Sequence, residues 1–267
     1  MKKYFLIFML LFISNKLIAQ TVKENQKEIL IGVDPYYAPF EYKGPGQKLA
    51  GFDIDLGNLL CKKINISCRW VEIDFDGLIA QLQTNKIDAI LSSLSITEKR
   101  LRTIGFSHVL YRVPSRLIAK KSAHLSTSIE LLQGKRIGVL SGTTQEIYAK
   151  TFWRPHNVKI IAYRTQDLIY QDLKAGRLDA AFQDEPQAKF GFLNKQKNLP
   201  VNSDNLNNEF ILVGERIDHS DIFGKGVAVG LRKNDIELKS KFDEAIKSID
   251  EKTFKDLQLK HFNEVIF

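Results

Sequence analysis

The chain alternates between short apolar runs, many of them β-branched, and segments in which apolar residues recur at helical spacing. Apolar runs at 29–33, 69–73 and 87–91 predict strands. Helical spacing at 53–63 and 77–84 predicts helices. Strands and helices that alternate in this way are typical of an α/β protein with a mostly parallel sheet.

The same alternation returns after a long middle stretch. Strands predicted at 136–140, 158–163 and 178–182 enclose helices predicted at 143–152 and 166–175. We therefore predict two α/β units that follow one another along the chain.

A short sequence pattern occurs once in each unit. Residues 82–89 (LQTNKIDA) and 173–180 (LKAGRLDA) agree in character at every position, with a basic residue, an apolar residue and Asp-Ala before a strand. The match favours a pseudo-repeat of the two units. Chance agreement is the alternative, because helix-to-strand joints in general share this pattern.

The last elements are too few for a third domain. A strand at 226–231 and helices at 236–249 and 252–262 are expected to dock on one of the two units. The Asn- and Lys-rich segment 194–208 predicts a surface loop.

The first residues have the pattern of a secretory signal peptide. Lys2 and Lys3 precede an apolar run at 4–13, and the small residue Ala19 follows a short polar stretch. We predict that residues 1–19 are a signal peptide and that the mature protein is exported; an uncleaved anchor is the alternative. No later run reaches the roughly 18 apolar residues that a membrane span needs.

The composition is that of an ordinary globular protein. Of 267 residues, 44% are hydrophobic and 26% are charged, which excludes a disordered or fibrous chain. The net charge is +8, and loss of Lys2, Lys3 and Lys16 with the signal peptide lowers it by three to +5. Because the basic residues are dispersed and an exported protein rarely meets nucleic acid, we expect no nucleic-acid partner.

The two cysteines lie close together in the sequence, at Cys61 and Cys68. Two nearby thiols are usually paired in an oxidising compartment, whereas two Cys without further Cys or His are too few for a tetrahedral zinc site. We predict a Cys61–Cys68 disulfide at a helix-to-strand corner, and no metal site.

Polar side chains follow the predicted strands at their carboxyl ends, where open α/β sheets bind ligands. In the first unit these segments are DPYYAPFE (34–41) and SSLSITEKR (92–100). In the second unit they are SGTTQ (141–145) and QDE (183–185). They offer hydroxyls, amides at helix starts, one guanidinium and several carboxylates, but no obvious nucleophile–base pair or metal cluster.

Together with GFDIDL (51–56), GVLSGTTQE (138–146) and the C-x6-C pair, these motifs resemble the periplasmic solute-binding proteins for polar amino acids. The resemblance is strongest to the lysine/arginine/ornithine- and histidine-binding proteins of ABC importers. It implies the type II periplasmic binding protein fold, in which two α/β lobes, each a mostly parallel sheet flanked by helices, are joined by two hinge crossings. By this likeness the first lobe comprises 20–111 plus 226–267 and the second comprises 112–225, and the protein is periplasmic.

The resemblance also implies a set of ligand-binding residues. These are Asp34, Tyr37, Phe75, Ser92, Ser93, Ser95, Arg100, Thr143, Thr144 and Asp184. A ligand carboxylate suits the fork of Arg100 and the amides around Thr143 and Thr144, while an ammonium suits Asp184 with groups of Ser93 and Ser95.

The remaining members of the set concern the ligand's side chain. The likeness assigns Tyr37 and Phe75 to its two faces and Asp34 to the distal nitrogen of a basic side chain. Taken singly, Arg100 is more often a solvated helix residue and Asp184 a helix cap, and only the joint match favours a site. Ser141 before Gly142 departs from the pattern of the basic-amino-acid group.

We therefore expect a monomeric binding protein without catalysis or cofactor that delivers lysine, arginine, ornithine or histidine to a membrane ABC permease. Glutamine is the alternative ligand, because glutamine-binding relatives also carry an acid at the position of Asp34. A prephenate-type (cyclohexadienyl) dehydratase with Glu41, Asp34 or Asp184 as an acid, and a receptor's ligand-sensing lobe, are the alternative functions. A dehydratase substrate without an ammonium would leave Asp184 unpaired, at a cost of roughly 1 to 3 kcal/mol.

Overall fold

The computed structural model describes residues 28–194 and 209–267. The predicted signal peptide and nearly all of the predicted Asn-rich loop lie outside these residues. Within them, no helix is both long and apolar enough to cross a bilayer. Nor do three or more His, Cys, Asp or Glu side chains gather there in a way that would hold a metal ion.

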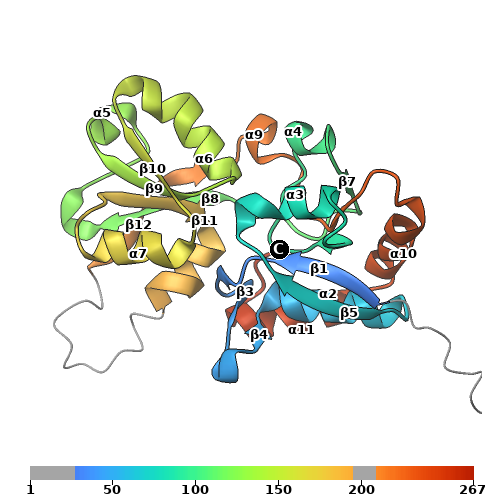
Figure 1. Ribbon diagram of the computed structural model, residues 1–267. Helices are drawn as coiled ribbons and strands as arrows, with labels where there is room; N and C mark the ends of the chain where they lie inside the picture. The colour runs from blue at the N-terminus through green and yellow to red at the C-terminus, as the bar shows by residue number, and fades with distance from the viewer. Residues whose placement is uncertain (1–27, 195–208) are drawn as a thin grey trace, which may run out of the picture.

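The first sheet has the strand order β5-β1-β6-β13-β7 (Figure 1). Its strands are β1 (Glu28–Val33), β5 (Ser67–Glu72), β6 (Ala89–Ile90), β7 (Gly105–Phe106) and β13 (Gly230–Leu231). β1 pairs in parallel with β5 and β6, whereas β13 is antiparallel to both of its neighbours. Four of the five strands therefore run in the same direction, as a mostly parallel sheet requires.

The second sheet repeats this arrangement in the order β10-β9-β11-β8-β12. Its strands are β8 (Ser115–Lys120), β9 (Arg136–Leu140), β10 (Lys159–Tyr163), β11 (Ala180–Asp184) and β12 (Phe210–Ile217). Here β8 is the strand that opposes the other four. The two predicted α/β units are thus confirmed, and each sheet has its reversed strand at the same position.

Helices flank each sheet. The longer helices of the first unit are α2 (Phe52–Lys63), α3 (Leu78–Gln83), α10 (Ile236–Lys247) and α11 (Glu251–Phe262). α2 and α11 lie on one side of β1 and β5, and α3 lies on the other (Figure 1). In the second unit α7 (Gln166–Lys174) packs against β9, β10 and β11, and α5 (Ile129–Leu132) and α6 (Thr144–Tyr148) are shorter.

The eight-residue pattern shared by the two units occupies equivalent places in them. The carboxylate of Asp88 accepts the N–H of Leu30 at 3.0 Å, and that of Asp179 accepts the N–H of Arg136 at 2.8 Å. Each aspartate thereby ties the start of its strand, β6 or β11, to the neighbouring strand, β1 or β9. The pseudo-repeat predicted from the sequence is confirmed by this geometry.

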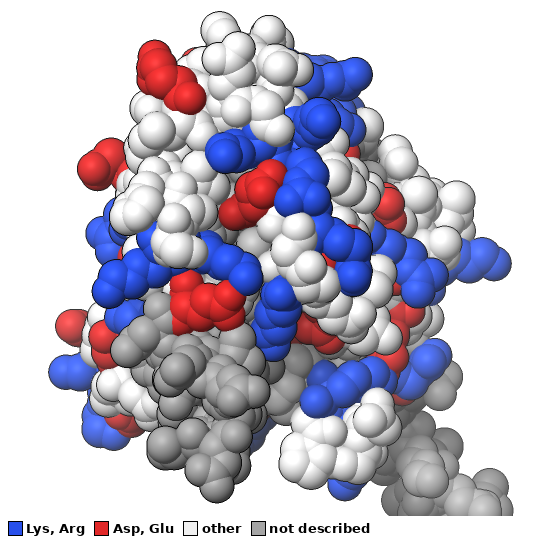
Figure 2. Space-filling model, turned by 90° about the vertical axis from the view of Figure 1, so that its left-hand side faces the viewer, with Lys and Arg blue, Asp and Glu red and all other residues white. Residues whose placement is uncertain are grey.

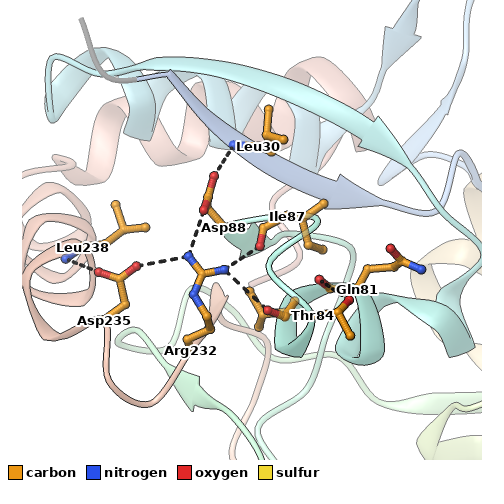
Figure 3. Close-up of polar contacts among 9 residues, drawn as sticks. Leu30, Gln81, Thr84, Ile87, Asp88, Arg232, Asp235 and Leu238 are labelled. Atoms are coloured by element: carbon orange, nitrogen blue, oxygen red, sulfur yellow. Dashed lines mark hydrogen bonds and ion pairs between the residues drawn. The ribbon is translucent and has the colours of Figure 1, made fainter. Parts of the chain in front are cut away.

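The carboxy-terminal elements dock on the first unit, as expected. The guanidinium of Arg232 donates to the carbonyl of Ile87 at 2.6 Å and to Asp88 at 2.8 Å (Figure 3). It also lies 3.5 Å from Asp235, which caps α10 by accepting the N–H of Leu238. The half-buried Arg232, just after β13, therefore links Asp88 of the repeated pattern to the start of α10.

The predicted disulfide between Cys61 and Cys68 is present, with a Cα–Cα distance of 6.1 Å. Cys61 lies near the end of α2 and Cys68 near the start of β5, so the bond joins a helix to the strand that follows it.

Two crossings connect the units, one from β7 to β8 and one from β12 to β13. They run side by side, because Val227 accepts the N–H of Leu110 and donates to the carbonyl of Tyr111, both at 2.8 Å. Only 230–231 of the predicted strand 226–231 joins the sheet, since the residues before it form the second crossing.

On the second unit's face in Figure 2, Lys and Arg side chains are spread out with Asp and Glu side chains between them.

Candidate functional site

A cavity lies between the two units, at the carboxyl ends of β1, β6, β9 and β11, with about 360 Å³ of empty space when its opening to solvent is included. All ten residues predicted as ligand-binding line it, together with Glu41, Leu140 and Gln145. The fold brings them together because the segments that follow parallel strands meet at one edge of each sheet, and the two edges face one another.

Arg100 lies in the wall of the cavity where the two units meet. It belongs to the short helix α4 (Glu98–Leu101), which Thr97 caps by accepting the N–H of Arg100 at 3.2 Å. The guanidinium donates to the carbonyl of Ser95 at 2.9 Å and to that of Gly142 at 3.1 Å, and it lies 5.5 Å from the centre of the Phe75 ring. Burial lowers the pKa of Arg100 to about 10, so the side chain stays charged at neutral pH.

The second unit contributes the beginning of α6 to the cavity wall near Arg100. Thr143 caps the helix by accepting the N–H of Glu146 at 3.2 Å, and Thr144 is the first helical residue. The φ angle of Gly142 is +78°, and a Cβ there would lie 2.9 Å from that of Asp76 in the first unit. Glycine thus permits both the turn and the close approach of the units. Ser141 is not among the cavity-lining residues.

Asp184, at the end of β11, is the acid of the second unit. Its carboxylate accepts the hydroxyl of Tyr37 at 2.9 Å, the side-chain amide of Gln145 at 2.7 Å and the hydroxyl of Ser115 at 3.5 Å. Burial raises the pKa of Asp184 to about 6, against these hydrogen bonds and the charge of Arg100. Asp184 is therefore mostly ionised at neutral pH, and its bond to Tyr37 joins the two units.

Asp34 and Glu41 are two further buried acids, and Ser92 connects them. The Ser92 hydroxyl accepts the N–H of Asp34 and donates to Oε1 of Glu41, both at 3.0 Å. Burial raises the pKa of Asp34 to about 7. The other oxygens, Oδ2 of Asp34 and Oε2 of Glu41, are buried without a hydrogen-bond partner.

Ser93 and Ser95 complete the wall contributed by the first unit. Ser93 donates its N–H to Asp53 at 2.7 Å, and its hydroxyl lies 3.2 Å from that of Tyr111. Ser93 has a positive φ of 48°, and the carbonyl of Ser95 is engaged by Arg100. Tyr37 and Phe75, the predicted aromatic walls, both line the cavity.

Three lining residues were not predicted as ligand-binding. Glu41 and Gln145 stand inside the quoted motifs DPYYAPFE and GVLSGTTQE, so their place beside the predicted residues was a usable signal. Leu140 is the last residue of β9, and its apolar character gave no indication of a site.

The cavity has the charge pattern of a receptor for a zwitterion that carries an additional positive charge. Arg100 and three acids, Asp34, Glu41 and Asp184, line it together, and all four are buried. Buried charges are costly unless they are paired, so a ligand that supplies an anion near Arg100 and cations near the acids would be stabilised.

Comparison with known proteins agrees with this fold and site. A model of the bacterial extracellular solute-binding proteins, family 3, matches residues 29–264. The lysine/arginine/ornithine-binding periplasmic protein of Escherichia coli K12 is 46% identical over 88% of this chain and 87% of its own length. The histidine-binding periplasmic protein of the same strain is 45% identical, over 89% and 88%.

A solved structure gives the same picture for the fold. A Salmonella typhimurium periplasmic binding protein, described for its high arginine specificity, superposes with a TM-score of 0.78. It is 27% identical and covers 88% of this chain and 99% of its own. The family match spans both units, the crossings and the cavity, and the chain therefore belongs to family 3 of the bacterial extracellular solute-binding proteins.

Proposed function

We propose that the protein binds one free basic amino acid in the cavity and delivers it to a membrane ABC permease. The observation that carries this proposal is that Arg100, from the first unit, and Asp184, from the second, line one cavity, which Asp34 also lines. In this assignment Arg100 binds the α-carboxylate and Asp184 the α-ammonium, so an amino acid links the two units and stabilises their closed arrangement.

The ligand's side chain extends toward Asp34, between Tyr37 and Phe75. A cationic end would meet the unpartnered oxygen of Asp34, which favours arginine, lysine, ornithine or histidine over a neutral side chain. The two relatives named above are lysine/arginine/ornithine- and histidine-binding proteins, which supports a basic ligand. Glutamine is the competing ligand.

The mobile parts in this proposal are two lobes, comprising 20–111 plus 226–267 and 112–225. They open and close about the crossings at Tyr111 and Val227, where the polypeptide passes between the sheets. The mature protein acts as a monomer in the periplasm after removal of residues 1–19, without catalysis or cofactor. The names of both relatives call them periplasmic, which supports this location.

The test is a thermal-shift screen of the mature protein against the twenty common amino acids and ornithine. A ligand at 100 times its dissociation constant stabilises the folded state by about 2.7 kcal/mol, which is a shift of several degrees. Arginine, lysine, ornithine or histidine should give the largest shift. If none of them raises the melting temperature, or if glutamine exceeds them all, the proposed ligand class is wrong.

A further inference from the structure

A wide helical turn of the second unit, η6 (Gln187–Leu193), contacts the first unit outside the ligand cavity, and none of its residues lines that cavity. The turn is fixed to its own unit. The ring of Phe192 stacks on that of Tyr170 in α7, with centroids 4.2 Å apart, and meets the ring of Phe210 in β12 at 5.5 Å. Because of this packing, η6 moves with the second unit when the units open or close.

Two side chains of η6 reach the carboxy-terminal part of the first unit. The ring of Phe190 lies 5.4 Å from that of Phe262, the last residue of α11. The ammonium of Lys189 pairs with the carboxylate of Glu264 just beyond that helix. The two charged side chains are 42% and 45% exposed, and exposed ion pairs contribute little. The aromatic pair therefore supplies most of the attraction between these two segments.

Gly191 brings the backbones of the two units close together. A Cβ built on this buried glycine would lie 2.1 Å from the carbonyl oxygen of Ala38 in the first unit, far inside ordinary van der Waals contact. The φ of Gly191 is not positive, so its backbone conformation is open to alanine. Within the second unit, such a Cβ would meet only the flexible end of Gln187, at 3.2 Å. The position of the first unit, and not the fold of the second, therefore requires glycine here.

The contact between Gly191 and Ala38 belongs to the closed arrangement of the units. Ala38 directly follows Tyr37, whose hydroxyl donates to Asp184 of the second unit at 2.9 Å. A rotation that opens the cavity separates Tyr37 from Asp184, and it carries Ala38 away from Gly191 as well. A side chain at position 191 therefore has room in the open arrangement and collides with the first unit in the closed one.

We propose that Gly191 is a positioning residue for ligand binding, which lets η6 seat against the Ala38 loop when the two units close. This inference rests on the proposed function. A side chain at position 191 raises the free energy of the closed protein by the same amount whichever amino acid is bound. Gly191→Ala should therefore weaken all ligands by one common factor, roughly fivefold to a hundredfold, as overpacking of a tight contact does.

The rates should divide in the same way. A ligand enters the open arrangement, in which position 191 is clear of Ala38, so its association rate should stay unchanged. It leaves only when the closed arrangement opens, so Gly191→Ala should raise the dissociation rate by the factor lost in affinity. A substitution that merely disturbed the fold of the second unit would lower the melting temperature of the ligand-free protein without this division of the rates.

The experiment is calorimetry and stopped-flow binding of arginine, lysine and histidine to the mature wild type and Gly191→Ala, with melting curves of the ligand-free proteins. Gly105→Ala in β7 is the matched control and should bind as the wild type, because a Cβ there would lie no closer than 3.5 Å to a neighbour. Unchanged affinity in Gly191→Ala, or losses that differ more than about threefold between ligands, would overturn the inference. Absence of arginine, lysine, ornithine and histidine binding to the wild type would instead overturn the proposed function.

Phe190→Ala takes the place of Gly191→Ala if the latter does not fold. It removes an attraction between η6 and α11 instead of adding a collision, and it leaves the ligand cavity untouched. We expect all ligands to bind about two- to tenfold more weakly, again through faster dissociation. A dissociation rate equal to that of the wild type would then contradict the proposal.

Discussion

Replacing Arg100 by alanine removes the cation that lies between the two units. Two of its nitrogens donate to the carbonyls of Ser95 and Gly142, at 2.9 and 3.1 Å. The remaining N–H donors are available to a ligand carboxylate in the fork geometry that a guanidinium provides. Arg100→Ala should therefore weaken the binding of every amino acid that the protein accepts, because the α-carboxylate is common to all of them.

The size of this loss follows from the bonds removed. Each hydrogen bond to a charged group contributes about 1.5 to 3 kcal/mol, so a bidentate pair contributes about 3 to 6 kcal/mol and its loss raises the dissociation constant about 10²- to 10⁴-fold. Calorimetry of wild type and Arg100→Ala measures it, with melting curves to verify folding. Arg100→Lys, which keeps the charge but not the fork, should lie between them. Retention of binding within about fivefold in Arg100→Ala would refute the assigned role.

Three other changes have separable outcomes. Asp34→Asn should weaken arginine far more than glutamine, and since burial raises the pKa of Asp34 to about 7, arginine affinity should fall as the pH drops below 7 in the wild type. In the ligand-free protein the sign is opposite: ionising Asp34 costs stability, so the wild type should lose unfolding free energy as the pH rises from the ordinary pKa of 3.8 to about 7, and equal slopes in Asp34→Asn would contradict this. Gly142→Ala should weaken all ligands by about 1 to 2 kcal/mol because the closed arrangement requires φ of +78° there; unchanged calorimetric affinities would show otherwise. Replacing Cys61 and Cys68 by serine should cost about 2 to 3 kcal/mol in urea unfolding without changing affinity, since the bond lies at the amino end of β5, away from the cavity.

The parallel strands could be predicted from the sequence because their signal is local. Each of β1, β9 and β11 contains an apolar run followed by polar residues. The position of the strand and its polar carboxyl end can therefore be predicted without knowing which strand pairs with it. The residues after these ends, such as Asp34 and Asp184, could then be assembled into one site by the rule that ligands bind there.

The strands with distant or very short pairings were predicted less well. β8 lies in the middle stretch, for which the sequence predicted no strands or helices. Its partners, β11 and β12, lie far along the chain. β6 and β13 are two-residue strands inside the longer strands predicted at 87–91 and 226–231, and the two-residue strand β7 was not predicted, because so few of these residues pair with a neighbouring strand. Helix 143–152 was predicted as one element, but regular α6 ends at Tyr148 and a wider helical turn continues to Trp153.

The site shows the same division between local and nonlocal information. Arg100 alone resembles a solvated helix residue, and its burial depends on Gly142 and Phe75, which come from other segments. Glu41 stands inside the motif DPYYAPFE, but its burial beside Ser92 and Asp53 is visible only once the fold places these residues around it.

The central claim is that one ligand is held at its α-carboxylate by Arg100 and at its α-ammonium by Asp184. Calorimetric titration with agmatine, which is arginine without the carboxylate, tests it most directly. Loss of a bidentate charged contact of about 3 to 6 kcal/mol should make agmatine bind at least a hundredfold more weakly than arginine. Agmatine binding within tenfold of arginine would contradict the account.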